Sequence, residues 1–441
     1  MKNYDKLLND LAPQKFGKKG VIWSISLTVL IILGILAYID QVIQGQIVTN
    51  MNDYALWGVY ISNFVFFVAT SFVGTITVAV LRLTKNPWRT PIVRIAEIIS
   101  VAAIIMAGLT IMIDMGRPDR IIYLFTHGRM QSPIIWDVII IPTFMAISLL
   151  LLYFPLLPDF ALLKKYYKDN KPSQSKWYGK LSLNWTGSDE QKSIQLKSIH
   201  IIALLLIPTG FMLQTVDAWL FSTLFRVGWD STNMGAYFIS GAAVAGIGAL
   251  IAVVYAVRRA YKLEEYITDF HFDKLGKFLV LTCLIYLYFN INEYLIPEFT
   301  SKKEEITHLN VLVTGEYAPL FWFVLVGGVI IPIIILLFKK GRKPFPIFLV
   351  SLLVVTGSWW KRYLIVTPTL LHPFLPIQGV PESWHHYFPS IHEWLITVAT
   401  LAMALLIITI LVRYVPIIPI QRTADEREEL EELELNKNTE K

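Results

Sequence analysis

Two aspartates stand at the edges of neighbouring apolar runs. The segment DMGRPDRIIYLFTHGRMQSPIIWD begins with Asp114 at the end of one run and closes with Asp137 just inside the next. A reaction that releases protons inside an apolar site needs a nearby carboxylate to accept them. We therefore predict that Asp114 and Asp137 are catalytic. The alternative for Asp137 is helix capping, because it follows Ser132 and Pro133 near the positive end of a helix dipole.

Two further carboxylates lie on polar faces of apolar runs. Gly210, Gln214 and Asp217 fall at positions i, i+4 and i+7, and residues 286–293 repeat this spacing and end in Glu293. Charged groups inside membrane helices are costly, so each one is a sign of function. We predict that Asp217 and Glu293 transfer protons.

Two titratable residues lie near the opposite ends of such runs. Glu97 precedes Asp114 by 17 residues in the same run, which is about 25 Å along a helix. His200 lies near the start of the run that contains Asp217. We predict that Glu97 and His200 also transfer protons. For Glu97 the alternative is a salt bridge with Arg94.

These residues need a membrane-spanning framework to position them. The chain has 441 residues, of which 55% are hydrophobic and only 16% are charged, a composition outside the soluble globular range. Backbone exposed to lipid must satisfy its own hydrogen bonds, so we predict an all-α integral membrane fold with ten transmembrane helices. The ten runs long enough to cross about 30 Å of hydrocarbon cover residues 20–43, 55–82, 93–114, 133–157, 198–223, 234–257, 275–297, 318–338, 344–366 and 392–415.

A short repeat divides these helices into two groups. WGVYIS at residues 57–62 opens the second helix, and MGAYFIS at residues 234–240 opens the sixth. Parallel repeats of this kind form two similar bundles. We predict two four-helix bundles, helices 2–5 and helices 6–9, with helices 1 and 10 peripheral. The predicted boundaries are a cytoplasmic N-terminus (1–19), helix 1 with its outer loop (20–54), the first bundle (55–223), the second bundle (234–366), helix 10 (392–415) and a charged cytoplasmic tail (416–441).

Lys and Arg are distributed unequally between the two sides of the predicted bundle. The side that includes both termini holds 31 of the 39. The positive-inside rule places this side in the cytoplasm, so the segment between Asp114 and Asp137 faces the outside. The net charge of +6 is thus a topology signal and gives no reason to expect nucleic acid as a partner.

Cysteine and histidine content limits the cofactors that this chain can hold. Its single cysteine, Cys283, excludes an intrachain disulfide and a cysteine-ligated iron–sulfur cluster. Only His200 lies clearly within a predicted helix, whereas a membrane haem normally needs two facing axial histidines. We therefore expect no haem, no iron–sulfur cluster and no metal bound by this chain.

The last predicted outer loop is unusually apolar. Residues 359–394 read WWKRYLIVTPTLLHPFLPIQGVPESWHHYFPSIHEW, a segment rich in aromatic residues and proline. An exposed apolar surface of this size usually marks a protein contact. We predict that a partner protein covers this loop.

Several segments resemble the polysulfide reductase membrane subunit family (NrfD/PsrC). The likeness extends over most of residues 50–415 and is strongest to the ten-helix branch, which includes membrane subunits of alternative complex III and of sulfite-reduction complexes. The segments are WGVYISNFVFFVATSFVGT, WRTPIVRIAEIISVAAIIMAGL, MGRPDR, SPIIWDV, YAPLFWFVLVGGVIIPIIIL, WWKRYLIVTPTLLHPFLP and HHYFPSIHEW.

The resemblance implies a quinone-reactive membrane subunit of a respiratory electron-transfer complex in a prokaryotic cytoplasmic (inner) membrane. Its substrate would be menaquinone or ubiquinone. Its partners would be an iron–sulfur subunit on the outer face, the other subunits of the complex and membrane lipid. The quinone site is predicted at the outer ends of helices 2–5 and comprises Tyr60, Asn63, Asp114, Arg117, Trp136 and Asp137. Coupled proton translocation is predicted through Glu97, His200, Asp217 and Glu293.

Simpler roles are open for some of these residues. Tyr60 and Asn63 also suit close helix packing, and Arg117 also suits ordering of its loop through Asp119. Some relatives carry a histidine on the second helix, but the stretch from Trp57 to Arg82 has none. The proton role in the first bundle would then fall to Asp114 or Asp137. The alternative function is a secondary transporter or ion pump, which also uses paired bundles and buried carboxylates.

Overall fold

The computed structural model describes residues 4–13, 17–82, 87–169, 171–373 and 378–426. Within these residues the protein is all-α and contains no strand. Ten segments are long and apolar enough to span a membrane, which confirms the predicted fold class. They are α2 (Lys18–Gln44), α3 through η2 (Val59–Leu81), α5 (Thr90–Asp114), α7 through α8 (Pro133–Tyr166), α10 (Asp189–Ser222), α11 (Met234–Tyr261), α12 (Asp269–Thr300), α14 through α15 (Ala318–Leu337), α16 (Pro344–Leu371) and α17 (Ile391–Tyr414).

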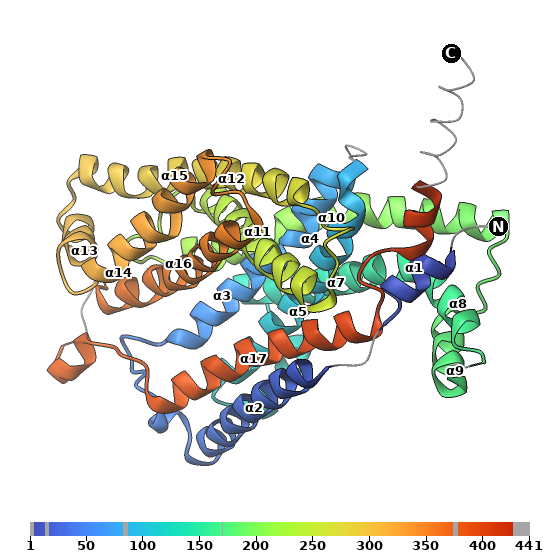
Figure 1. Ribbon diagram of the computed structural model, residues 1–441. Coiled ribbons are helices and arrows are strands. Elements are labelled where there is room, and N and C mark those ends of the chain that lie inside the picture. The colour runs from blue at the N-terminus through green and yellow to red at the C-terminus, as the bar shows by residue number, and fades with distance from the viewer. Residues whose placement is uncertain (1–3, 14–16, 83–86, 170, 374–377, 427–441) are drawn as a thin grey trace.

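The long helices run side by side between two ends of the molecule (Figure 1). One end carries α13 (Lys303–Val313) and the connecting segment before α17; the other carries α1 (Tyr4–Leu11) and α9 (Pro172–Leu181). We call these the outer end and the inner end, after the predicted orientation. The first and the last described residues both lie at the inner end, as expected for a chain with an even number of spans. Residues 427–441 of the predicted charged tail lie outside the described residues.

Helices α2 and α17 pack against each other along one edge of the bundle (Figure 1). Their approach is close because Gly34 of α2 has no side chain: a Cβ there would lie 2.1 Å from the Cβ of Ala399. Only four residues of α2 are buried, so most of its apolar surface faces outwards, as suits a helix in contact with lipid.

Helix α3 lies at the centre of the bundle. Every residue of α3 (Val59–Ser71) is buried, and this helix contacts α5, α11 and α16. Small residues permit the close contacts, since a Cβ on Gly74 would meet the Ser100 side chain at 2.7 Å. α7 packs on α5 and α10, and α11 packs on α10, α12 and α16. The predicted division into two four-helix bundles remains a prediction.

Helix α16 corrects the prediction for the segment that begins at Trp359. The structure continues this helix to Leu371, so residues 359–371 are helical and do not belong to the predicted outer loop. Lys361 and Arg362 are therefore buried inside the bundle, with 4% and 2% of their surfaces exposed. The predicted outer loop included these two cations, and the structure places them inside the helix bundle.

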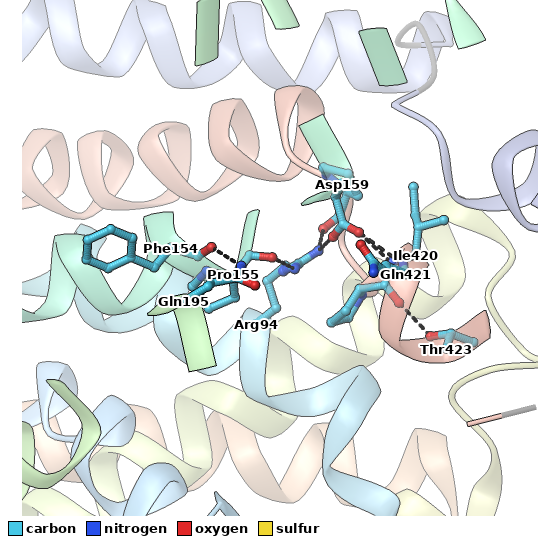
Figure 2. A network of polar contacts seen from close by, with 10 residues as sticks. Arg94, Phe154, Pro155, Asp159, Gln195, Ile420, Gln421 and Thr423 are labelled. Atoms are coloured by element: carbon cyan, nitrogen blue, oxygen red, sulfur yellow. Dashed lines mark hydrogen bonds and ion pairs between the residues drawn. The ribbon is translucent and has the colours of Figure 1, made fainter. Parts of the chain in front are cut away.

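A buried ion pair fastens the chain's last described segment to the inner end (Figure 2). Arg94 of α5 and Asp159 of α8 (Leu157–Tyr166) are each 2% exposed and approach to 2.7 Å. The other carboxylate oxygen of Asp159 accepts hydrogen bonds from the backbone N–H groups of Ile420 and Gln421, each at 3.1 Å. Arg94 also donates to the carbonyl of Pro416 at 2.9 Å. We call residues 415–426 the C-terminal strap.

Candidate functional site

Two aspartates from neighbouring helices are buried together in the outer half of the bundle. Asp137 of α7 (Pro133–Tyr153) is 3% exposed and Asp217 of α10 is 0% exposed, and the two carboxylates interact electrostatically. Among the described residues, none of their four oxygens has a hydrogen-bond partner. Trp136 and Trp219 make an edge contact beside them, with ring centroids 6.1 Å apart. A buried carboxylate without partners is expensive, so this pair is a strong sign of function.

The capping alternative for Asp137 is wrong. Ser132 occupies the N-cap of α7, and its side chain makes no capping hydrogen bond. The oxygens of Asp137 are enclosed and bind no backbone N–H within the described part of the chain. The Asp137 side chain therefore faces the helix bundle and does not cap the N-terminus of α7.

Arg362 of α16 completes this cluster. It interacts electrostatically with Asp217, and its guanidinium lies 5.7 Å from the centre of the Phe238 ring. Gly241 of α11 makes room for it, because a Cβ there would lie 3.1 Å from Nη2 of Arg362. We call Asp137, Asp217 and Arg362 the central cluster. It places two carboxylates and one cation in the buried interior of the bundle.

A second polar group lies nearer the outer end, around Lys361. The Lys361 ammonium donates to the Tyr294 hydroxyl and lies 4.7 Å from the centre of that ring. It also interacts electrostatically with Glu293 of α12. Oxygen Oε2 of Glu293 is enclosed and has no hydrogen-bond partner among the residues described. The buried Lys361 and the half-buried Glu293 therefore interact electrostatically.

This pair borders a cavity of about 230 Å³, which we call the outer cavity. Its wall comes from α11, α12, α13, α16 and the segment between α10 and α11. His308 of α13 lies in the wall, and burial lowers its pKa to about 3, with repulsion from His372 and Lys361 adding to the effect. The outer cavity is large enough for several water molecules and has polar groups to hold them.

Aromatic hydroxyls lie between the central cluster and the outer cavity. The rings of Tyr237 and Tyr286 stack with centroids 5.4 Å apart, and their hydroxyl oxygens are 3.4 Å apart. Asn290 donates to the Tyr237 hydroxyl at 3.4 Å. Tyr286 interacts with Arg362, and Tyr237 lines the outer cavity. The two polar groups are thus connected through the interior.

The residues predicted to bind quinone lie in three places. The first holds Tyr60, Asn63 and Asp114, the second Arg117, and the third Trp136 and Asp137. Tyr60 donates to Gln41 of α2 at 2.7 Å. Asn63 donates to Thr397 of α17 at 2.9 Å and accepts from Trp359 of α16 at 2.7 Å. These contacts fit the helix-packing alternative, and they do not test ligand binding.

Asp114 lies close to Tyr60, whereas Arg117 lies apart from both. Asp114 interacts electrostatically with Tyr60 and Glu393, and its Oδ1 is enclosed with no hydrogen-bond partner in the described part of the protein. Arg117 is 64% exposed and pairs with Asp119 at 3.0 Å. That hydrogen bond lowers the pKa of Asp119. The third place is at Trp136 and Asp137, beside α10.

The inner-end residues predicted to transfer protons share a cavity of about 710 Å³. Glu97 and His200 both line it, together with the Arg94–Asp159 ion pair and part of the C-terminal strap. Arg94 pairs with Asp159 at 2.7 Å, and the Arg94–Glu97 salt bridge stays an alternative for Glu97. We call this space the inner cavity. Glu97 and Asp114 stand near opposite ends of α5, as their spacing predicts.

Sequence reasoning missed three of these buried polar residues: Tyr237, Lys361 and Arg362. Tyr286 was given only as the first position of the polar face that ends in Glu293, and Tyr237 lay without a role in the MGAYFIS motif. The signal for the cations was stronger, because Lys361 and Arg362 lie within the predicted ninth apolar run, five and four residues before its end. A pair of adjacent cations at that depth needs buried partners.

The sequence model of the NrfD polysulphide reductase family matches residues 47–373, about three quarters of the chain. The chain belongs to this family. Three relatives align over almost their whole length. They are a putative membrane subunit of a dimethyl sulfoxide reductase from Halobacterium salinarum (25% identical; 93% of this chain and 93% of the relative), a subunit of the selenate reductase of Mesobacillus selenatarsenatis (23%; 89% and 93%) and the integral membrane subunit of a menaquinone reductase of Nitratidesulfovibrio vulgaris (23%; 91% and 92%).

All three relatives are named as parts of reductases, and two are named as membrane subunits. The NrfD family assignment agrees with the resemblance that the sequence motifs indicated. The ten apolar helices and the family together identify this chain as a multi-pass membrane protein of the NrfD type.

Proposed function

We propose that this NrfD-family chain is the quinone-reactive membrane anchor of a reductase complex. The observation that carries the proposal is the set of enclosed, unpartnered carboxylate oxygens in the outer half of the bundle, on Asp114, Asp137 and Asp217. The name of the menaquinone reductase relative supports a quinone as the reactant. The substrate of this chain is then menaquinone or ubiquinone.

A quinone reaction separates electrons from protons at the quinone ring. Oxidation of a quinol releases two electrons and two protons, and reduction of a quinone consumes the same. A carboxylate near each ring oxygen accepts or supplies the protons, while the electrons pass to or from the partner. Asp114 and Asp137 are the proposed proton acceptors. The other proposed quinone contacts are Tyr60 and Asn63 of α3, Trp136 next to Asp137, and the exposed Arg117; the proposed site therefore extends across three places at the outer ends of these helices.

The electron partner is proposed to be an iron–sulfur subunit docked at the outer end. Large apolar side chains are exposed on the connecting segments there, including Ile47, Phe125, Phe225 and Phe388. Aromatic side chains are enriched at protein contacts, and we take these exposed residues as part of the docking surface for that subunit. A docked partner there lies nearer to the central cluster than one at the inner end.

The proposed location is a prokaryotic cytoplasmic (inner) membrane, with both termini in the cytoplasm. The unequal distribution of Lys and Arg supports this orientation. Glu97 and His200 in the inner cavity, and Asp217 and Glu293 in the outer half, are the proposed proton-transfer groups. A reporter enzyme fused after Lys441 tests the orientation, since alkaline phosphatase should be inactive there and a cytoplasmic reporter active.

Isolation of the chain from its native membrane tests the function. An affinity tag on the chain should retain iron–sulfur subunits, and organic extraction of the complex should yield quinone in near-stoichiometric amount. The redox partners should reduce or oxidise added quinone only when this chain is present. A chain that purifies without redox partners and transports a solute when reconstituted alone would contradict the proposal and favour the transporter alternative.

A further inference from the structure

The direct way from the central cluster to the outer end is closed by aromatic rings. Phe221 follows Asp217 by one turn on the same face of α10, towards the outer end. Phe221 and Trp229 are both 0% exposed, with ring centroids 5.0 Å apart. Trp57 stacks on Trp229 at 6.0 Å and meets Phe221 edge-on at 5.9 Å. Phenylalanine and tryptophan side chains have no group that accepts and passes on a proton, so these three packed rings offer no route along this face of α10.

Polar side chains of α11, α12 and α16 lie in the sideways direction, between the central cluster and the outer cavity. Arg362 connects Asp217 to Tyr286. Tyr286 and Tyr237 bring their hydroxyls to 3.4 Å, and Tyr237 reaches the wall of the outer cavity. Glu293 lies in the same wall, beside Lys361. Hydroxyl groups and enclosed water are the usual carriers of protons through a protein interior.

We propose that protons of the quinone reaction pass between the central cluster and the outside sideways, through the Tyr286–Tyr237 pair and Glu293 to the outer cavity. This route rests on the proposed function, and it joins Asp217 and Glu293, which the sequence suggested only as separate proton-transfer groups. It assigns roles to Tyr237, Tyr286 and Lys361.

Each step conserves protons. The Asp217 carboxyl group gives its proton to a Tyr hydroxyl or to a water molecule beside it, and that group passes its own proton onward, so no tyrosine changes charge overall. The Glu293 carboxylate receives the proton and releases it to water in the outer cavity. Quinone reduction runs the same steps in reverse, with uptake from the outside.

Lys361 and Arg362 are positioning residues in this route. The Lys361 side chain interacts with Glu293 and offsets the charge of its carboxylate once the proton has left for water. The Arg362 guanidinium interacts with both Asp217 and Tyr286 and holds these two side chains in place. Neither cation has to lose a proton for the route to operate.

The test uses the whole complex reconstituted in liposomes that contain a pH indicator on the outer-face side. The variants are Tyr237→Phe and Tyr286→Phe, alone and combined, because each removes one hydroxyl and keeps the ring. Proton release or uptake at the outer face should slow more than tenfold in the double variant, with kcat lowered, KM for quinone unchanged and a larger solvent deuterium isotope effect.

The matched control is Tyr255→Phe. Tyr255 is on the same helix as Tyr237, but its ring stacks on that of Phe348 with centroids 4.5 Å apart, and it is not part of the proposed route. It should behave as the wild type. Co-purification of the partner subunits reports assembly for every variant. If the assembled double variant exchanges protons at the wild-type rate while quinone turnover proceeds, the sideways route is wrong and the proposed function stands. If the wild-type complex does not react with quinone at all, the proposed function itself is wrong.

Discussion

Replacement of Asp159 should release the C-terminal strap from the inner end. Both partners of the Arg94–Asp159 pair are 2% exposed, so removal of the carboxylate leaves a buried guanidinium without its counter-charge. Loss of one partner of a buried pair costs about 3–5 kcal/mol. The same carboxylate binds the N–H groups of Ile420 and Gln421, so the cost falls on the strap itself.

Hydrogen exchange at these two amides measures the effect directly. A loss of about 3–5 kcal/mol in local opening free energy corresponds to exchange faster by roughly two to three and a half orders of magnitude. Asp159→Ala should show the full effect. Asp159→Asn should show much of it, because an amide cannot offer one oxygen to the backbone and another to Arg94.

The control is Asp119→Asn in the exposed pair with Arg117, whose side chains are 59% and 64% exposed. An exposed pair contributes at most about 1 kcal/mol, so exchange nearby should change less than roughly tenfold. Exchange of the strap amides within threefold of the wild type in Asp159→Ala would show that buried apolar contacts alone hold the strap, and the reasoning would fail.

Three further changes test other parts of the account. Glu293→Gln should leave the complex assembled but slow quinone turnover and lower the number of protons moved per electron; wild-type values for both would remove Glu293 from the proton path. A Cβ on Gly357 would lie 2.7 Å from the Cα of Gly328, so Gly357→Ala should destabilise the bundle by about 1–3 kcal/mol. The control is Gly108→Ala, which has no atom within 4 Å of its new Cβ and should be neutral or stabilise by up to about 1 kcal/mol. Equal melting temperatures for the Gly357→Ala and Gly108→Ala variants would refute the packing argument. Because the pKa of His308 falls from 6.5 to about 3 on folding, the unfolded chain binds its proton first, and stability should decrease by about 1.4 kcal/mol per unit as pH falls below 6.5; His308→Gln should show a flatter dependence.

The membrane-spanning elements could be predicted because a helix in lipid needs length and apolarity and little else. The predicted helix ends were wrong where a helix continues beyond its apolar run. α16 continues through Pro368 to Leu371, although a proline usually ends a helix near the preceding residue. α10 begins at Asp189 rather than near residue 198, because Ser188 caps it and its first turns are polar. Apolarity alone cannot detect a helix that extends beyond the membrane.

The candidate site could be predicted only one residue at a time. The depth of Asp137 and of Asp217 follows from their positions in the apolar runs, but their proximity depends on the packing of α7 against α10. No spacing within a single helix contains that information. Lys361 was missed for a related reason: cations near a predicted helix end are usually counted with the loop, and here tertiary contacts with Tyr294 and Glu293 bury it.

The rate of quinone turnover in the assembled complex tests the central claim most directly. The variant should carry both Asp114→Asn and Asp137→Asn, which preserve size and remove the ability to take up a proton. Loss of a general base lowers a rate by about 10²–10⁴-fold, so we expect turnover to fall at least a hundredfold while the partner subunits remain bound. A fully assembled double variant that oxidises or reduces quinone at the wild-type rate would contradict the account.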